Sequence, residues 1–245
     1  MLQTTQGVVL RSIKYGETSL VSTLFTRIYG VQTYLVQGIR AAAKGRTSRA
    51  GLLQPATLLD IVVYHKPGKS LQRVREFSPF YIYTNLQEHI VRNSIALFSV
   101  ELLFRLLPQD APAPELFDFT VAYFQHLDHL PTHAVANFPL FFLIQCSRYL
   151  GYEIHGAYSE QTPFLNLAEG SFTAQPPVLG SPLTDDDARA LASLIKVRKF
   201  EDLQHTEMNA AMRMRLLEWY LQFLQRHTEH MAPMKSLDVL KAILH

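Results

Sequence analysis

The residues with the clearest chemical potential form a short cationic segment at positions 38–49. It holds four cations and no carboxylate, with glycines at positions 38 and 45, and the cations are Arg40, Lys44, Arg46 and Arg49. Guanidinium and ammonium groups gathered in this way attract phosphate groups. Runs typical of strands flank the segment, which predicts a long basic loop projecting from a small barrel. We interpret it as a phosphate-contacting surface, with a solvated basic loop as the alternative.

Further cations surround this segment in sequence. Residues 1–80 carry eleven Lys and Arg against three Asp and Glu, a formal charge of +8, whereas the remaining 165 residues carry twelve against eighteen, which gives −6. This division predicts that one end of the chain meets polyanions. The supporting cations are Arg11, Lys14, Arg27, Lys66, Lys69, Arg73 and Arg75. Four tyrosines could stack bases beside them, although tyrosine is also an ordinary strand residue: Tyr15, Tyr29, Tyr34 and Tyr64.

Other groups that could support catalysis have structural explanations. The aspartates at 185–187 follow Thr184 and precede an apolar-periodic run, which predicts the capped start of a helix rather than a metal site. The histidines at 126–133 and 227–230 have no cysteine companions and no HExxH pattern. Cys146 lies in an apolar run without an activating base. Phosphate-loop, dinucleotide and GxSxG patterns are absent, so the sequence predicts no enzymatic activity.

Two small basic clusters lie outside the N-terminal region. The first cluster is explained adequately as cations at the C-terminal end of a helix, where they complement the helix dipole. The second cluster lies in the next predicted helix. Either cluster could add to a path for a polyanion. They comprise Lys196, Arg198 and Lys199, and Arg213 and Arg215.

Composition describes a globular protein of one large or two modest domains. The chain has 245 residues, of which 48% are hydrophobic and 18% charged. The single cysteine favours a reducing, cytoplasmic location. The first six residues lack the pattern of a signal peptide, and the densest apolar run, at 138–146, is too short to cross a bilayer, so we expect no membrane insertion.

The first 80 residues have the pattern of a small β-domain. Predicted strands cover residues 7–15, 18–27, 31–37, 58–64 and 71–77, separated by turns at Gly16, Gly30 and Gly68. Five short strands without a long helix between them suit a closed barrel. An OB-fold leads because it binds nucleic acid on its strands and loops, and an SH3-like barrel is the alternative.

From residue 81 the period becomes helical. Helices are predicted at 85–107, 115–128, 137–150, from Thr184 onward, at 207–226 and at 236–244. Prolines and glycines interrupt residues 152–183, which predicts a small irregular module. The predicted class is therefore α+β with several domains: an OB-fold domain at 1–80 and an all-helical domain at 81–245 that carries the module as an insert.

Several segments resemble the RecO family of bacterial recombination mediators. Residues 15–30, YGETSLVSTLFTRIYG, are similar to the family's N-terminal signature, which continues in the basic loop and in GLLQP at 51–55. The later RYLGY at 148–152 resembles the family's LGY segment. The resemblance spans nearly the whole chain and is most specific in residues 7–55.

The resemblance implies a protein of DNA repair and homologous recombination without enzymatic activity, located with the nucleoid in the cytoplasm. Such proteins bind single- and double-stranded DNA, anneal complementary strands, and act with RecR to replace single-strand-binding protein (SSB) by RecA. They contact the acidic C-terminal tail of SSB through the helical domain. A protein-interaction scaffold whose basic barrel binds an acidic partner protein is the alternative function.

The chain departs from the family in the irregular module. Many RecO proteins carry a four-cysteine zinc motif there, whereas residues 152–183 contain no cysteine. We therefore predict no zinc and no other cofactor. The module should instead be held by packing of side chains such as Phe164, Leu165, Leu167 and Phe172.

Overall fold

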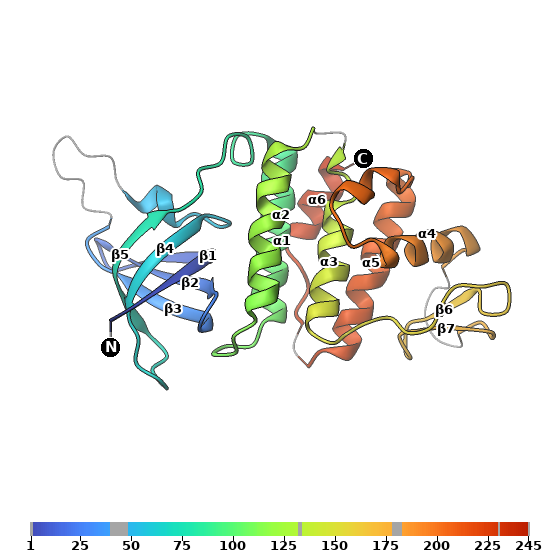
Figure 1. Cartoon of the computed structure of the whole chain (residues 1–245), viewed down its shortest axis with the longest axis horizontal. Coiled ribbons are helices and arrows are strands. Elements are labelled where there is room, and N and C mark those ends of the chain that lie inside the picture. Colours follow the sequence, from blue (N-terminus) through green and yellow to red (C-terminus); the bar gives the residue numbers. More distant parts are fainter. Residues whose placement is uncertain (1, 40–48, 132–133, 178–182, 230, 245) are drawn as a thin grey trace. The chain divides into compact units, whose positions relative to one another are not determined.

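The computed structural model describes residues 2–39, 49–131, 134–177, 183–229 and 231–244 (Figure 1). The chain forms two compact units. The first comprises residues 1–89 and 100–128, and the second comprises residues 90–99 and 129–245. The barrel ends near the predicted boundary at residue 80, but the first unit continues beyond it into the helical part of the chain. We call the two units the barrel unit and the helical unit.

Five strands close into a barrel in the order β1-β2-β3-β5-β4 (Figure 1). The strands are β1 (Leu2–Tyr15), β2 (Ser19–Thr26), β3 (Gly30–Val36), β4 (Leu58–Tyr64) and β5 (Gln72–Pro79). Strand β1 is antiparallel to both β2 and β4, and β3 runs parallel to β5. This closed five-stranded arrangement confirms the OB-fold interpretation.

Strand β1 starts five residues earlier than the sequence predicted. Residues 2–8 pair with β4 in unbroken register from Leu2–Tyr64 to Val8–Leu58. The segment Gln3–Thr4–Thr5–Gln6 has no apolar alternation, so its strand character comes from pairing across the barrel rather than from its own pattern.

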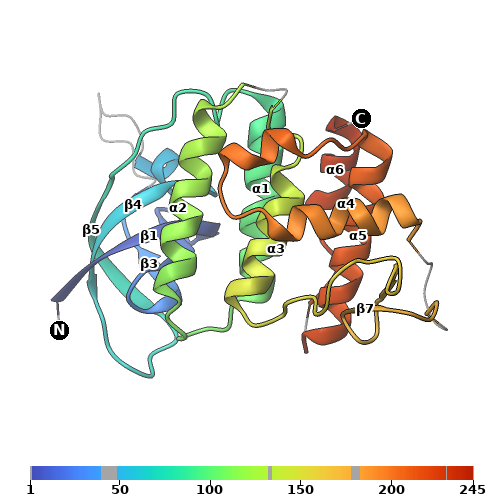
Figure 2. The ribbon, with the colours of Figure 1, turned by 45° about the vertical axis from the view of Figure 1, so that its right-hand side comes forward.

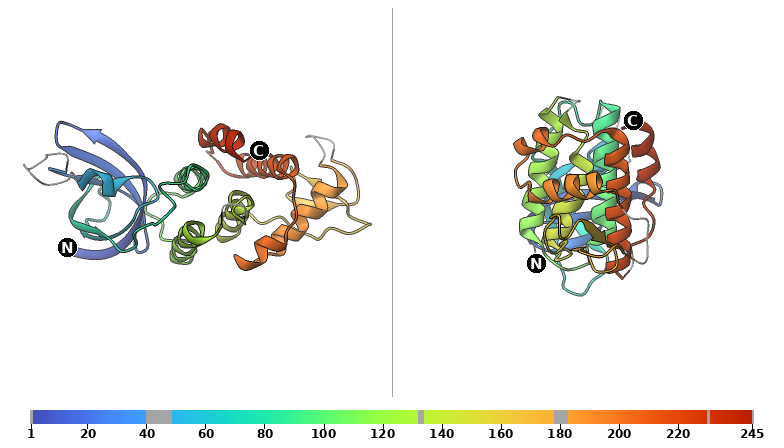
Figure 3. Two further views of the ribbon diagram at one scale, coloured as in Figure 1. Left: turned by 90° about the horizontal axis from the view of Figure 1, so that it is seen from above. Right: turned by 90° about the vertical axis from the view of Figure 1, so that its right-hand side faces the viewer.

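The barrel interior is apolar and continuous. Figure 3 shows the strands curving around it. The short helix η1 (Arg49–Leu53) adds Leu53 to this core, and the Leu53 carbonyl accepts a 2.7 Å hydrogen bond from Ser12 Oγ. The buried core residues are Val9, Leu20, Leu24, Tyr34, Val36, Ile39, Leu53, Leu59, Ile61, Val63 and Phe77.

Helix α2 (Pro114–His129) packs against the barrel within the same unit. The rings of Phe25 and Phe117 meet edge to face with centroids 5.5 Å apart. Gly30 has a φ of 65°, and a Cβ there would lie 2.2 Å from the Ala111 carbonyl oxygen. Only glycine allows the β2–β3 turn this conformation and this close approach.

Helix α1 (Ile90–Leu106) starts five residues later than predicted. The buried carboxylate of Asp128 accepts hydrogen bonds from the backbone N–H groups of Thr84, Asn85 and Leu86, at 3.0, 2.7 and 2.7 Å. These donors are held outside a helix, so the apolar period of the sequence placed the helix start too early. Within α1, Glu101 and Arg105 form an i,i+4 ion pair of 3.3 Å.

The helical unit is built around α3 (Phe138–Tyr149), whose residues 138–147 are all buried. Gly151, with a φ of 81°, lies just beyond the end of this helix. Around it lie α4 (Asp185–Lys196), α5 (Ala210–His227) and α6 (Ser236–Ile243). Figure 2 shows α4 crossing α5. In the described part of the chain, no helix combines the length and apolar character needed to cross a membrane.

The predicted irregular module contains a short hairpin of β6 (Phe164–Asn166) and β7 (Ser171–Thr173). Leu165 and Phe172 face its interior and are 3% and 8% exposed. Gly170 lies against α5, where a Cβ would be 2.6 Å from the ring of Phe223. Apolar packing therefore contributes to holding the module on the helical unit.

Candidate nucleic-acid interface

The predicted phosphate contacts divide into two groups. Arg40, Lys44 and Arg46 lie outside the described residues. The other eight all belong to the barrel unit, and each is an exposed residue or lies in an exposed turn: Arg11, Lys14, Arg27, Arg49, Lys66, Lys69, Arg73 and Arg75.

Arg49 anchors the chain where it returns to the barrel after the basic loop. Its guanidinium lies 4.4 Å from the centroid of the Phe77 ring, and Nη2 donates a hydrogen bond to the Phe77 carbonyl. The residue remains exposed at the start of η1. Arg49 therefore combines a positioning role with an accessible positive charge.

Arg27 is engaged within the barrel unit. Its Nε and Nη2 donate to Oδ1 and Oδ2 of Asp118 in α2, at 2.8 and 2.9 Å. The hydrogen bond and the opposite charge raise the pKa of Arg27, and the same hydrogen bond leads the lowering of the Asp118 pKa. Both side chains are about half exposed. Asp118 therefore neutralises Arg27 locally through two hydrogen bonds.

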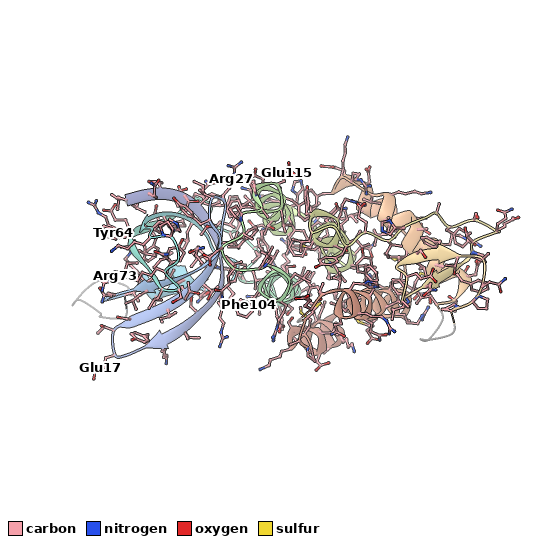
Figure 4. The ribbon with its side chains drawn as sticks, turned by 90° about the horizontal axis from the view of Figure 1, so that it is seen from below. Glu17, Arg27, Tyr64, Arg73, Phe104 and Glu115 are labelled. Carbon is pink, nitrogen blue, oxygen red and sulfur yellow. The ribbon has the colours of Figure 1, made fainter. Side chains whose placement is uncertain are left out.

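Strand β5 presents two exposed arginines. Arg73 lies directly opposite Tyr64 of β4, and the two side chains are beside one another on the outside of the barrel (Figure 4). Arg75 lies at a register shift between β4 and β5: Val62 pairs with Glu76 and Val63 with Val74, so Arg75 has no partner in the ladder. It forms a 3.2 Å ion pair with the neighbouring Glu76. Arg73 has no ion-pair partner among the described residues.

The turn between β4 and β5 is fixed from inside. Gln72 is 2% exposed, and its Nε2 donates to the carbonyls of Lys66 and Lys69 at 2.8 and 2.9 Å. Its Oε1 accepts from the Lys66 N–H at 3.0 Å. The buried amide thus orders the backbone of a turn that exposes two lysines.

Two more cations lie near the end of β1. The guanidinium of Arg11 is 5.9 Å from the centroid of the Phe104 ring. Lys14 is exposed and lies opposite Leu20 of β2. Both residues lie beyond the register shift between Val9 and Arg11, so alternation places their side chains on opposite faces of the strand.

The four tyrosines have different surroundings. Tyr34 is fully buried in the barrel core, and burial raises its pKa strongly, so the suggestion that it stacks a base is wrong. Tyr29 already stacks on His65 with ring centroids 3.9 Å apart. Tyr15 and Tyr64 are 56% and 47% exposed. Only parity along β3 could have revealed that Tyr34 points inward, because Val36 shares its face.

The aspartates and the cysteine in the helical unit are structural. Thr184 Oγ1 accepts from the Asp187 N–H at 3.2 Å, which confirms the predicted cap of α4. Both oxygens of Asp187 accept hydrogen bonds from Arg215, at 2.7 and 2.9 Å. Cys146 is buried, and burial raises the pKa of its thiol. Among the residues with described positions, no group of three His, Cys, Asp or Glu side chains could hold a metal ion.

The exposed part of the site suits the neutralisation of phosphates. Its guanidinium and ammonium groups come from four places on the barrel unit: β1, η1, the β4–β5 turn and β5. Such groups bind a nucleic-acid backbone without reading its sequence. These accessible charges remain the predicted contacts for a polyanion.

Comparison with known proteins identifies two family regions that together cover most of the chain. Residues 1–83 match "Recombination protein O N terminal", and residues 87–238 match "Recombination protein O C terminal". The chain is 32% identical to the DNA repair protein RecO of Bacteroides fragilis and 28% identical to that of Christiangramia forsetii, each over 99% of both chains. It is 33% identical to the RecO protein of Salinibacter ruber over 60% of this chain and 55% of that protein.

Proposed function

The chain belongs to the RecO family of DNA repair proteins, and from this premise we propose that it is a recombination mediator that binds single- and double-stranded DNA. The observation that carries the proposal is the set of exposed cations on the barrel unit. They would hold the sugar–phosphate backbone through contacts that are independent of sequence. A protein that acts wherever DNA is damaged needs binding of this kind.

Strand annealing follows from the same contacts. Two complementary strands repel each other through their phosphates, and a cationic surface that neutralises both lowers this repulsion while the bases stay free to pair. The step needs no nucleophile and no metal-bound water. We therefore propose that the protein acts without enzymatic activity and without zinc.

The remaining parts of the proposal rest on family membership. The protein would act in the cytoplasm with RecR, receive the acidic C-terminal tail of SSB on its helical unit, and help RecA replace SSB on single-stranded DNA. The separation of charge along the chain supports the DNA-binding part of this proposal, since all eleven predicted cations lie in the barrel unit.

The test removes the cations of the basic loop. A variant with Arg40, Lys44 and Arg46 changed to Gln, and a second that adds Arg49→Gln, are titrated with single-stranded DNA across a range of salt concentrations. Each lost phosphate contact should make the salt slope shallower by about 0.7 to 0.9. An unchanged slope would reject the loop as a phosphate site.

The matched control removes three exposed cations of the helical unit. Changing Arg189, Arg226 and Lys235 to Gln lowers the net charge by the same amount as the first variant. The control should keep the slope of the unmodified protein. An equal loss in both variants would mean that overall charge, and not the loop, governs binding.

A further inference from the structure

A row of outward-facing side chains crosses all five strands of the barrel. The ladder pairs Ile13 with Val21, Val21 with Leu35, and Leu35 with Arg73. It then pairs Arg73 with Tyr64, and Tyr64 with Leu2. Directly paired residues project from the same face of a sheet, so these six side chains form one continuous row. We call it the outer row.

The row faces solvent and not the core. Its neighbours along the strands alternate inward: Leu20, Tyr34, Val63 and Gln72 are all buried. Within the row, Ile13, Tyr64 and Leu2 are 46%, 47% and 44% exposed, and Val21 and Leu35 are partly exposed. Five of the six side chains are apolar or aromatic, which is unusual for the outer surface of a barrel.

Several cations lie near this apolar row, either paired with its members or a few residues from them in the sequence. Arg73 stands within it, between Leu35 and Tyr64. Lys66 and Lys69 lie in the turn that follows Tyr64, and Arg11 lies two residues before Ile13 and so projects from the same face of β1. The surface therefore joins a strip that favours apolar or aromatic partners to a border that favours anions.

We propose that the outer row receives the bases of single-stranded DNA while its cationic border holds the phosphates. A single strand has both chemistries at the right scale, because every nucleotide carries a flat base and an anionic phosphate. Aromatic and apolar side chains beside cations are how proteins hold single strands without sequence preference. The inference rests on the proposed function and deepens it, since it distinguishes how the barrel binds single strands from how it binds duplex.

Duplex DNA cannot use the row in this way. Its bases are paired and stacked inside the helix, so it presents only phosphates and groove edges to a convex barrel surface. The cationic border should bind both forms of DNA, and the row should add affinity for single strands alone. This added affinity does not release counterions, so it should be independent of salt.

The experiment replaces the row by polar residues that suit strands. A variant with Ile13, Leu35 and Tyr64 changed to Thr is compared with the unmodified protein in binding single-stranded and blunt duplex DNA across salt. We expect single-strand affinity to fall about tenfold or more at every salt concentration, with the same salt slope. Duplex affinity should change less than twofold.

A control removes three exposed apolar side chains elsewhere. Ile28, Ile82 and Tyr149 are 48%, 79% and 42% exposed and lie outside the row, and changing them to Thr should leave both affinities unchanged. Because the triple row variant could fold poorly, single variants Tyr64→Phe and Tyr64→Leu are measured as well. Tyr64→Phe keeps a ring and should bind normally, whereas Tyr64→Leu should lose several-fold in single-strand affinity only.

Three results would overturn the inference. Equal losses on single-stranded and duplex DNA would show that the row supports the fold or the phosphate contacts. Unchanged single-strand binding in a folded row variant would show that bases do not touch it. Binding of poly-glutamate that depends on the row would assign it to an acidic protein instead. Failure of the unmodified protein to bind any DNA would reject the proposed function itself, which separates the two failures.

Discussion

Arg27 and Asp118 are joined by two parallel hydrogen bonds of 2.8 and 2.9 Å, although they lie 91 residues apart in sequence. The pair links the end of β2 to α2 within the barrel unit. Arg27, like Arg75 beside Glu76, is thus paired with one of the protein's own carboxylates. Net charge indicates the polyanion-binding unit, but only the contacts of each residue indicate which charges are available.

Asp118→Asn should release Arg27 for phosphate binding. Removing the carboxylate leaves the guanidinium exposed and unneutralised beside the other barrel cations, so single-strand affinity should rise at low salt. The salt slope should become steeper by about 0.7 to 0.9 if Arg27 gains one phosphate contact. Fluorescence anisotropy with labelled single-stranded DNA across salt measures both quantities.

Glu115→Gln is the control for the release of Arg27. Glu115 is an exposed carboxylate in the first turn of the same helix, and its removal changes the net charge equally. It should not alter the slope. If Asp118→Asn and Glu115→Gln behave alike, or if neither changes binding, Arg27 does not lie on the DNA path.

Gly30→Ala should destabilise the barrel unit severely. The new methyl group would lie 2.2 Å from the Ala111 carbonyl oxygen, and the backbone holds a φ of 65°. We expect a loss of about 3 kcal/mol or more in the free energy of unfolding. Gly16→Ala provides the comparison, because its φ is 60° but nothing lies within 4 Å of the new methyl group. That variant should lose only about 1–2 kcal/mol, as denaturant unfolding would measure, and equal losses would contradict the close packing at Ala111.

Asp187→Asn should lower stability at neutral pH and matter less in acid. Burial acts to raise the pKa of Asp187, but hydrogen bonds from Arg215 and Thr184 outweigh it and leave the pKa below the ordinary 3.8. A carboxylate with a lowered pKa stabilises the fold above 3.8, and this contribution disappears as the pH falls through the folded-state value.

We therefore expect Asp187→Asn to lose about 1–2 kcal/mol at pH 7, since Asp187 is 1% exposed but its partner Arg215 is half exposed. The difference from the unmodified protein should narrow as the pH falls below 3.8. Asp186→Asn, at the exposed neighbouring position, should cost no more than about 0.5 kcal/mol at pH 7. A gap that stays constant between pH 7 and pH 3 would mean that the charge of Asp187 is not what stabilises α4.

Purified protein should contain no stoichiometric zinc. The chain has a single cysteine, at position 146 in α3, and the module at 152–183 is packed through Leu165 and Phe172. Elemental analysis after dialysis measures the metal content directly, and a chelator should leave the melting temperature unchanged. One zinc ion per chain, or a chelator-dependent loss of the fold, would refute the prediction.

The sequence predicted the five strands and most helices because their patterns are local. The alternation of apolar residues identifies strands β2–β5, and Thr184 identifies the start of α4. Both signals come from residues that are neighbours in the sequence. The first residues of β1 and the start of α1 were placed wrongly because distant partners decide them. Leu2 is held in a strand by Tyr64, and the segment at 84–86 is held out of a helix by Asp128.

The candidate site divides in the same way. Counting charges located the cations, but it could not show that Asp118 forms an ion pair with Arg27 or that Tyr34 points into the core. The outer row was missed because Ile13, Leu35 and Tyr64 belong to different strands and meet only through the register of the closed barrel. Parity along each strand identifies the outward side chains, but register is needed to join them into one surface.

The most direct test of the account is the binding of the unmodified protein to random-sequence single-stranded DNA at increasing salt. We predict tight binding at low salt, with the logarithm of the affinity falling linearly against the logarithm of the salt concentration. The slope should correspond to several phosphate contacts at about 0.7 each. Absence of binding at low salt, or an affinity that does not depend on salt, would contradict the account and favour a scaffold for an acidic partner protein.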